Sequence, residues 1–239
     1  MVRGHNRIPP MRQPDQSPTP DSAANLEWRD GGVPVSRRFD DPYFSLGGGL
    51  DETRHVFLSG NELPARLVPG FHVAELGFGT GLNLLALRLI CPDDLPIRFT
   101  SFEAYPMHGA EIARALATFP ELQPVAAPFL SVWQSGARTF QLGPIAVEVI
   151  EGDARETLPA WPGRADAWFL DGFSPAKNPE LWGEALLAQV GVHTAPGGTC
   201  ATYTAAGFVR RGLSAAGFDV TRAPGFGHKR HMSKGSKNG

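Results

Sequence analysis

The stretch FHVAELGFGTG, residues 71–81, decides the fold of this chain. Its first six residues form a short, mostly apolar run, which is typical of a buried parallel strand. The glycines that follow, Gly77, Gly79 and Gly81, permit a tight turn and a close approach of the backbone to a ligand. Residues 83–90 then predict a helix. A strand, a glycine loop and a helix in this order begin an α/β fold that binds its ligand at the loop.

Strand and helix signals alternate along the rest of the chain. The expected strands are 97–103, 145–150, 165–170, 198–203 and 218–221, and the expected helices are 108–119, 179–193 and 207–216. This alternation predicts a doubly wound, mostly parallel sheet that binds ligands at the carboxyl ends of its strands.

The composition divides the chain into four parts. Residues 1–25 contain five prolines and few apolar side chains, so we expect a flexible tail. Residues 26–67 predict a small N-terminal extension of strands and helices packed on the main fold. Residues 68–232 form the main domain, and residues 233–239 are expected to be a basic, flexible tail.

Whole-chain composition excludes several classes of protein. Hydrophobic residues make up 42% of the 239 residues, which is enough for a core and excludes wholesale disorder. The sequence has no apolar run long enough to span a membrane and no secretory h-region, so we expect a cytoplasmic protein without a membrane partner. Cys91 and Cys200 are too few for a disulfide framework, and His228 and His231 lack a third ligand, so no metal site is expected.

The charge is distributed unevenly. The net charge is −2, but all 24 acidic residues lie between Asp15 and Asp219, and both ends of the chain are basic. One interpretation is that the basic ends steer a polyanion to one edge of an acidic body. The alternative is that these ends are simply solvated.

The glycine loop differs from two common nucleotide-binding motifs. In the dinucleotide fingerprint a third glycine stands where this chain has Leu82, and no Gly-Lys-Ser/Thr follows as in a P-loop. An acid such as Glu75 before G-x-G-x-G suits S-adenosyl-L-methionine (SAM), which has an amino-acid end and no pyrophosphate. The alternative is a loop that serves only as a turn.

Two further carboxylates follow predicted strands. Glu103 stands 26 residues after Gly77, close to the position where Rossmann-like folds bind the ribose hydroxyls. The alternative for Glu103 is a capping or surface role. Asp153 is placed either near the adenine or at the N-cap of a short helix.

The segment DGFSPAKNP, residues 171–179, follows the apolar strand ADAWFL directly. Asp171 therefore emerges at the ligand edge of the sheet, beside the reactive end of a cofactor. The prolines, Phe173 and the Lys177-Asn178 pair resemble the lip of a substrate site. The alternative is that Asp171 only caps a turn.

Eight blocks of the sequence together resemble one known family. They are YFS (43–45), LDETRHVFLSGNELP (50–64), ELGFGTGLNLL (75–85), SFEAYP (101–106), EGDARETLP (151–159), WFLDGFSPAKNPELW (168–182), ATYTAAGFVRRGL (201–213) and GFGHKRHM (225–232). The resemblance is to the tRNA 5-methylaminomethyl-2-thiouridine methyltransferases of the MnmD type, which also form the amino-terminal part of bifunctional MnmC. It covers about residues 40–232, and the block around Asp171 is its most specific part.

The resemblance implies a Rossmann-like class I SAM-dependent methyltransferase that acts on the anticodon loop of tRNA. Its reaction is methylation of the aminomethyl group on C5 of uridine 34, giving 5-methylaminomethyl(-2-thio)uridine. The implied catalytic residue is Asp171, and the implied cofactor-binding residues are Glu75, Gly77, Phe78, Gly79, Thr80, Gly81, Asn83, Glu103, Asp153 and Asp171 itself. On the substrate side we expect Phe173 and Pro175 to stack on the extruded base, and Lys177, Asn178, Lys229 and Arg230 to contact the RNA.

The chain departs from the family pattern at two points. His231 stands where the closing block usually has an acid, and we expect no flavin oxidase half in this chain. We therefore expect that a separate flavin oxidase, if the pathway needs one, removes the carboxymethyl group. A carboxyl with the ordinary Asp pKa near ~3.9 is a poor base for an ammonium, so we expect Asp171 to orient the amine rather than deprotonate it.

Three other functions stay open from the sequence. The first is a methyltransferase of another amine, in a small molecule or a protein. The second is an aminopropyltransferase of the spermidine synthase kind, and the third is an RNA-binding protein without activity.

Overall fold

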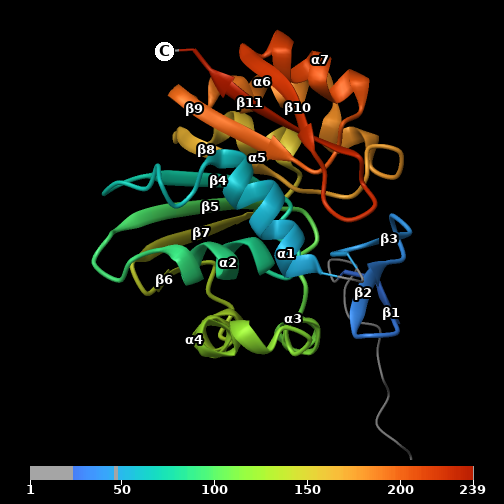
Figure 1. Ribbon diagram of the computed structural model, residues 1–239. Helices are drawn as coiled ribbons and strands as arrows, with labels where there is room; N and C mark the ends of the chain where they lie inside the picture. Colours follow the sequence, from blue (N-terminus) through green and yellow to red (C-terminus); the bar gives the residue numbers. More distant parts are fainter. Residues whose placement is uncertain (1–23, 46–47, 239) are drawn as a thin grey trace, which may run out of the picture.

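The computed structural model describes residues 24–45 and 48–238, so nearly all of the predicted tail of residues 1–25 lies outside the described part. Within the described residues, eight strands form one sheet in the order β10-β11-β9-β8-β4-β5-β7-β6 (Figure 1). The parallel strands are β4 (His72–Leu76), β5 (Ile97–Glu103), β7 (Ile145–Glu151), β8 (Ala165–Leu170) and β9 (Thr194–Thr202). Strands β6 (Thr139–Leu142) and β11 (His231–Lys237) run antiparallel to them, and β10 (Phe218–Pro224) pairs antiparallel with β11. The predicted Rossmann-like α/β fold is confirmed.

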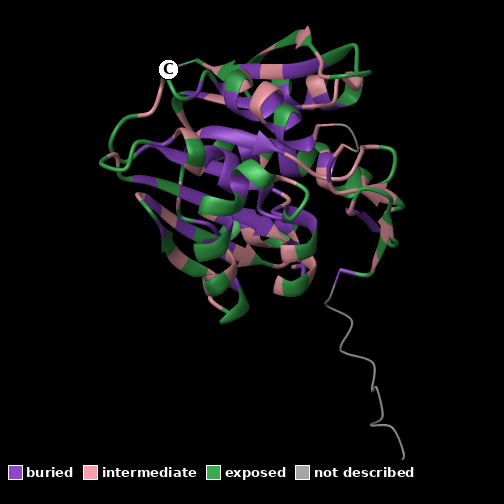
Figure 2. Cartoon of the chain, turned by 60° about the horizontal axis from the view of Figure 1, so that its bottom comes forward, coloured by how far each residue is buried: buried purple, intermediate pink, exposed green. Residues whose placement is uncertain are grey.

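Helices cover both faces of the sheet. They are α2 (Leu82–Ile90), α3 (Gly109–Leu116), α4 (Gln123–Gln134), α5 (Ala154–Ala160), α6 (Glu184–Val192) and α7 (Gly207–Ala215). Side chains alternate between the faces along each strand, so Phe169 packs on the side of α2 and α4, and its neighbour Trp168 packs on the side of α5, α6 and α7. The residues on both faces of the central strands are buried (Figure 2).

The N-terminal extension consists of a small sheet and a helical segment. The strands β1 (Leu26–Arg29), β2 (Val33–Ser36) and β3 (Asp41–Pro42) pair antiparallel beside the main sheet (Figure 1). The helix α1 (Gly49–Thr53) continues into a π-helical turn (Arg54–Leu58) and a 3-10 turn (Ser59–Asn61). Buried Val56, Phe57 and Leu58 join this segment to the core on the α2 side of the sheet.

The prediction of a flexible tail at residues 233–239 is wrong for residues 233–237, which belong to a strand. Residues 231–237 form β11, which pairs with β10 on one side and β9 on the other. Ser233 and Gly235 are buried, and a Cβ at Gly235 would lie 3.1 Å from Cys200 Sγ. Two neighbouring strands satisfy the backbone of this polar segment, so its order does not depend on apolar side chains.

Two other differences lie at prolines and glycines. Helix α4 is not predicted from the sequence, because Pro124 and Pro128 break the helical pattern. Strand β6, which is only four residues long, is not predicted either. Pro124 is tolerated since the first helical turn needs no N–H donor at that position. The predicted helix 179–193 is a 3-10 turn (Pro179–Trp182) and then α6, separated at Gly183, whose extended backbone ends the first turn.

Candidate active site

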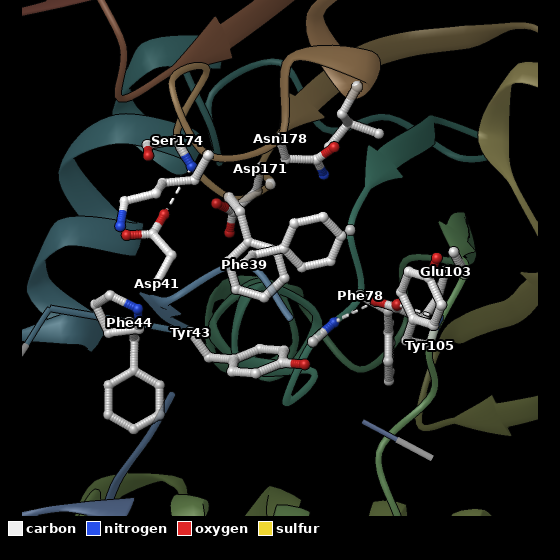
Figure 3. Close-up of a pocket in the computed structure, with 18 of the residues that line it drawn as sticks. Phe39, Asp41, Tyr43, Phe44, Phe78, Glu103, Tyr105, Asp171, Ser174 and Asn178 are labelled. Carbon is white, nitrogen blue, oxygen red and sulfur yellow. Dashed lines mark hydrogen bonds between the residues drawn. The ribbon is translucent and has the colours of Figure 1, made fainter. Parts of the chain in front are cut away.

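A cavity of about 570 Å³ opens at the carboxyl ends of β4, β5, β7 and β8 (Figure 3). The loops after these strands form its floor, and residues of the N-terminal extension form the opposite wall. Its volume is in the range of small-molecule and cofactor sites. The sequence-predicted residues that line it are Gly77, Phe78, Gly79, Thr80, Asn83, Glu103, Asp153, Asp171, Phe173, Lys177, Asn178 and Lys229.

The glycine loop is held against the loop that follows β8. Gly77 has a φ of +88°, and a Cβ at this position would lie 2.1 Å from the carbonyl oxygen of Asp171. Only glycine avoids this overlap with a backbone atom, so the close contact of the two loops depends on Gly77. The glycine loop and the predicted catalytic residue are thus in direct backbone contact.

Glu103 fixes the other side of the glycine loop. Its Oε2 accepts a hydrogen bond of 2.9 Å from the backbone N–H of Gly79, and its Oε1 accepts one of 2.8 Å from the N–H of Tyr105. Burial raises the pKa of Glu103, and these backbone hydrogen bonds oppose the rise. Each carboxylate oxygen keeps a lone pair, and the side chain lines the cavity, so Glu103 fits two ribose hydroxyls.

Asn83 joins two carboxyl groups at the opposite end of the loop. Its Nδ2 donates to Glu75 Oε1 at 2.8 Å and to Asp171 Oδ2 at 2.7 Å. Its Oδ1 accepts from the hydroxyl of Thr53 at 2.9 Å. These three bonds fix the direction of the amide, so Asn83 holds the Asp171 side chain in one orientation.

Glu75 holds Asn83 in place but does not line the cavity. Its side chain is completely buried, and Ser101 Oγ donates to its second oxygen at 2.7 Å. Burial raises the pKa of Glu75 well above its ordinary value. The sequence placed Glu75 among the cofactor-binding residues, but in the structure it contacts Asn83, which in turn contacts Asp171. Gly81 likewise lies outside the cavity lining, packed against Phe129.

Asp171 titrates near neutrality. Burial raises its pKa to about 7, the hydrogen bond from Asn83 opposes the rise, and the charges of Glu52 and Lys229 act in opposite directions. The expectation of an ordinary pKa near 3.9 is therefore wrong for this residue. A carboxyl group that changes protonation near pH 7 suits general acid–base chemistry.

Aromatic residues of the extension meet the loop after β8. Phe39 stacks on Phe173 with ring centroids 4.7 Å apart, and Tyr43 contacts the same ring edge-on at 5.0 Å. Asp41 Oδ2 accepts a 2.7 Å hydrogen bond from the backbone N–H of Ser174 (Figure 3). Sequence reasoning assigned no role to the extension residues here, although Tyr43 opens the YFS block, which was the available signal.

The remaining predicted residues are placed differently from one another. Asp153 caps α5 by accepting from the N–H of Arg155 at 2.9 Å and also lines the cavity, so both of its suggested positions are compatible with the structure. Lys177 forms an ion pair with Asp40, and Lys229 forms one with Glu52. Pro175 and Arg230 lie outside the cavity lining. The two lysines expected at phosphates are therefore both paired with carboxylates.

Two absences hold for the described residues 24–45 and 48–238. No group of three His, Cys, Asp or Glu side chains there is arranged to hold a metal ion. No helix in this part of the chain is long and apolar enough to cross a membrane.

Comparison with known proteins identifies relatives of this chain. Residues 120–238 match the family model described as S-adenosyl-L-methionine-dependent methyltransferase. The chain is 47% identical over 230 residues to the tRNA 5-methylaminomethyl-2-thiouridine biosynthesis bifunctional protein MnmC of Ectopseudomonas mendocina, covering 89% of this chain and 34% of that protein. It is also 47% identical over 223 residues to the protein of the same name from Caulobacter vibrioides, covering 89% and 38%. The chain thus spans little more than a third of the length of these relatives.

Solved structures share the fold. The crystal structure of MNMC2 from Aquifex aeolicus superposes with a TM-score of 0.75 at 23% identity, covering 92% of this chain and 72% of that one. Precorrin-6y C5,15-methyltransferase from Geobacter metallireducens gives a TM-score of 0.51 at 14% identity, covering 82% and 91%. At these identities the likeness establishes a common Rossmann-like architecture.

Proposed function

Since the chain belongs to the S-adenosyl-L-methionine-dependent methyltransferases, we propose that it methylates the aminomethyl group on C5 of uridine 34 in tRNA, giving 5-methylaminomethyl(-2-thio)uridine. The observation that carries the proposal is a single cavity that joins a cofactor-type glycine loop to Asp171. The relatives named for this modification supply the identity of the acceptor.

The residues around the glycine loop fit SAM. Gly77 and Gly79 have positive φ and line the cavity with backbone alone, and Glu103 faces the cavity with free lone pairs for ribose hydroxyls. Asp153, at the end of β7, lies on the same wall for the adenine end. When bound, SAM supplies a methyl group made electrophilic by its sulfonium.

Asp171 prepares the acceptor nitrogen for attack. A primary alkyl amine with a pKa near ~10.4 arrives as an ammonium and must pass one proton to the Asp171 carboxylate before its lone pair is free. Transfer to an ordinary Asp is uphill by about 9 kcal/mol, and transfer to a carboxyl with a pKa of about 7 is uphill by about 5 kcal/mol. The raised pKa therefore supports a role as base, in addition to orientation of the amine by Asp171 and Asn83.

The product nitrogen is a secondary ammonium, and its charge develops as the new C–N bond forms and the C–S bond breaks. Once Asp171 has taken the proton its carboxyl is neutral, and its carbonyl oxygen accepts a hydrogen bond from the amine N–H. This bond strengthens as the nitrogen gains charge, so it stabilises the transition state more than the ground state, which is the requirement for acceleration. The aromatic residues Phe39, Tyr43 and Phe173 provide walls against which a planar, unpaired base can stack. An anticodon-loop nucleotide has both features, a base outside a duplex and an amine.

The experiment is transfer of labelled methyl from SAM to bulk tRNA that lacks this methyl group, followed by mass spectrometry of the nucleosides. We expect 5-methylaminomethyl(-2-thio)uridine from the wild-type protein and none from Asp171→Ala, with SAM affinity kept in both. Labelled tRNA without this nucleoside, or no labelled tRNA at all, would contradict the proposal. Product formed only from decarboxylated SAM would identify an aminopropyltransferase instead.

A further inference from the structure

Glu52 and Lys229 form an ion pair inside the cavity, on the side of Asp171. Lys229 Nζ lies 2.6 Å from Glu52 Oε1, and Ser45 Oγ donates a hydrogen bond to the other oxygen of Glu52. The Glu52 side chain is only 11% exposed, whereas the Lys229 side chain is 43% exposed. The anion is thus a largely buried part of the wall, and the cation reaches it from a partly exposed side chain.

Lys229 Nζ lies in a small site whose surrounding groups attract a cation. It is 4.2 Å from the centroid of the Tyr203 ring, a geometry typical of a cation–π contact. The Tyr203 hydroxyl donates a hydrogen bond of 2.6 Å to the carbonyl oxygen of Gly172, the residue that follows Asp171 in the chain. This bond holds the Tyr203 ring in place. Glu52, Asp171 and Lys229 all line the same cavity, and the charges of Glu52 and Lys229 both act on Asp171.

We propose that Glu52 is a further substrate-binding residue, which binds the primary ammonium of the acceptor in the place that Lys229 Nζ occupies in the free protein. Lys229 is then an internal substitute for the substrate cation and competes with it. This inference rests on the proposed function, since it places the amine of that acceptor between Glu52, Tyr203 and Asp171.

Binding of the substrate ammonium at Glu52 replaces one ammonium by another, so the charge of Glu52 stays compensated. A largely buried carboxylate that loses its cation is strongly destabilised, whereas one that exchanges cations keeps its compensation. The released Lys229 ammonium returns to water, where its charge is solvated. A neutral acceptor, such as a hydroxymethyl group at the same position, offers no cation to replace it. Glu52 therefore selects amines over alcohols before the methyl transfer begins.

The first test is steady-state methyl transfer to tRNA at saturating SAM and about pH 8. Glu52→Gln keeps the size of the side chain and removes its charge, so we expect the KM for tRNA to rise at least about tenfold with unchanged SAM affinity. The matched control is Glu121→Gln, another carboxylate paired with a cation, Arg54, but outside the cavity. A KM for Glu52→Gln equal to that of the control would overturn the inference.

The second test measures the KM for tRNA in Lys229→Met. The KM is expected to change in opposite directions depending on whether Lys229 competes with the acceptor or binds RNA phosphates. If Lys229 competes with the acceptor, Lys229→Met lowers the KM for tRNA, and combining it with Glu52→Gln abolishes the gain. If Lys229 binds RNA phosphates, the KM rises in Lys229→Met. The matched control is Lys234→Met, which also removes one lysine charge but lies on β11, outside the cavity lining. A lower KM in Lys234→Met of the same size, or a higher KM in Lys229→Met, would overturn the inference.

A third measurement separates this inference from the proposed function. The protein saturated with S-adenosylhomocysteine is titrated by calorimetry with benzylammonium, and with benzyl alcohol as the neutral analogue. We expect benzylammonium to bind wild-type protein more tightly than benzyl alcohol, and Glu52→Gln to lose this preference. Binding that depends on Glu52 in a protein that does not methylate tRNA would refute the proposed function and support the inference. Methylation of tRNA by a protein that binds benzylammonium no more tightly than benzyl alcohol would support the proposed function and refute the inference.

Discussion

Replacement of Asp171 by asparagine is expected to stabilise the protein while it abolishes methyl transfer. The pKa of this carboxyl is about 7 in the folded protein and 3.8 by its ordinary value, so the folded state holds the proton more tightly than the unfolded state. Ionisation inside the cavity therefore costs stability as the pH rises from about 4 to 7. Above pH 7 the cost is fully present and amounts to about 4 kcal/mol, from a shift of about three pKa units.

Asparagine removes this cost and keeps the local contact. Its Oδ1 still accepts the hydrogen bond from Asn83 Nδ2, which now spans 2.7 Å to the Asp171 oxygen. From the same pKa values, the gain in unfolding free energy is about 4 kcal/mol at pH 8 and about 2 kcal/mol at pH 5. The sign follows from the direction of the shift, because a raised carboxyl pKa makes the ionised native state less stable.

The assay is urea unfolding of wild-type protein and Asp171→Asn without cofactor, at pH 8 and pH 5, with methyl transfer measured on the same preparations. The difference between the two proteins cancels the contributions of all other titrating groups. If Asp171→Asn is less stable than wild type at pH 8, the raised pKa of Asp171 is refuted. The same holds if its gain in unfolding free energy is equal at both pH values. Full methyl transfer by the variant would remove Asp171 from the chemistry.

Three other substitutions test separate parts of the site. Gly77→Ala is expected to lower the unfolding free energy by about 3 kcal/mol and to prevent SAM binding, because its Cβ would overlap the Asp171 carbonyl oxygen; chemical unfolding and calorimetry measure both. Glu103→Gln should weaken SAM binding about tenfold or more, since its amide nitrogen must face one of two backbone N–H donors; calorimetry decides. Arg230→Ala should flatten the slope of log tRNA affinity against log salt by about 0.7–0.9 if Arg230 contacts one phosphate, while an unchanged slope would exclude that contact.

The sequence was sufficient for the parts of the site that follow from the parallel sheet. Glu103 ends β5 and Asp171 directly follows β8. The carboxyl ends of parallel strands meet at one edge, so the convergence of both residues on the loop at Gly77 follows from the chain order. The short apolar runs predicted the central strands for the same reason. Local patterns carry this information because each element contains its own signal.

Pairings across long stretches of chain could not be predicted from local patterns. Lys229 meets Glu52 across 177 residues, and Asn83 meets Asp171 across 88, and neither spacing follows from helix or strand periodicity. The raised pKa of Asp171 depends on enclosure by segments far apart in the chain, so its ordinary value was the only available assumption. The same holds for β11, whose order comes from its two neighbouring strands.

The contact between Phe39 and Phe173, together with the hydrogen bond from the Ser174 N–H to Asp41, joins two cavity walls whose bonded residues lie 133 positions apart in the chain. One wall belongs to the N-terminal extension and the other to the loop after β8. Both contacts would break if these segments moved apart. The enclosure of the cavity therefore depends on the extension as well as on the large sheet: without the extension, the glycine loop and Asp171 would stand open to water, and the desolvation that raises the pKa of Asp171 would be lost.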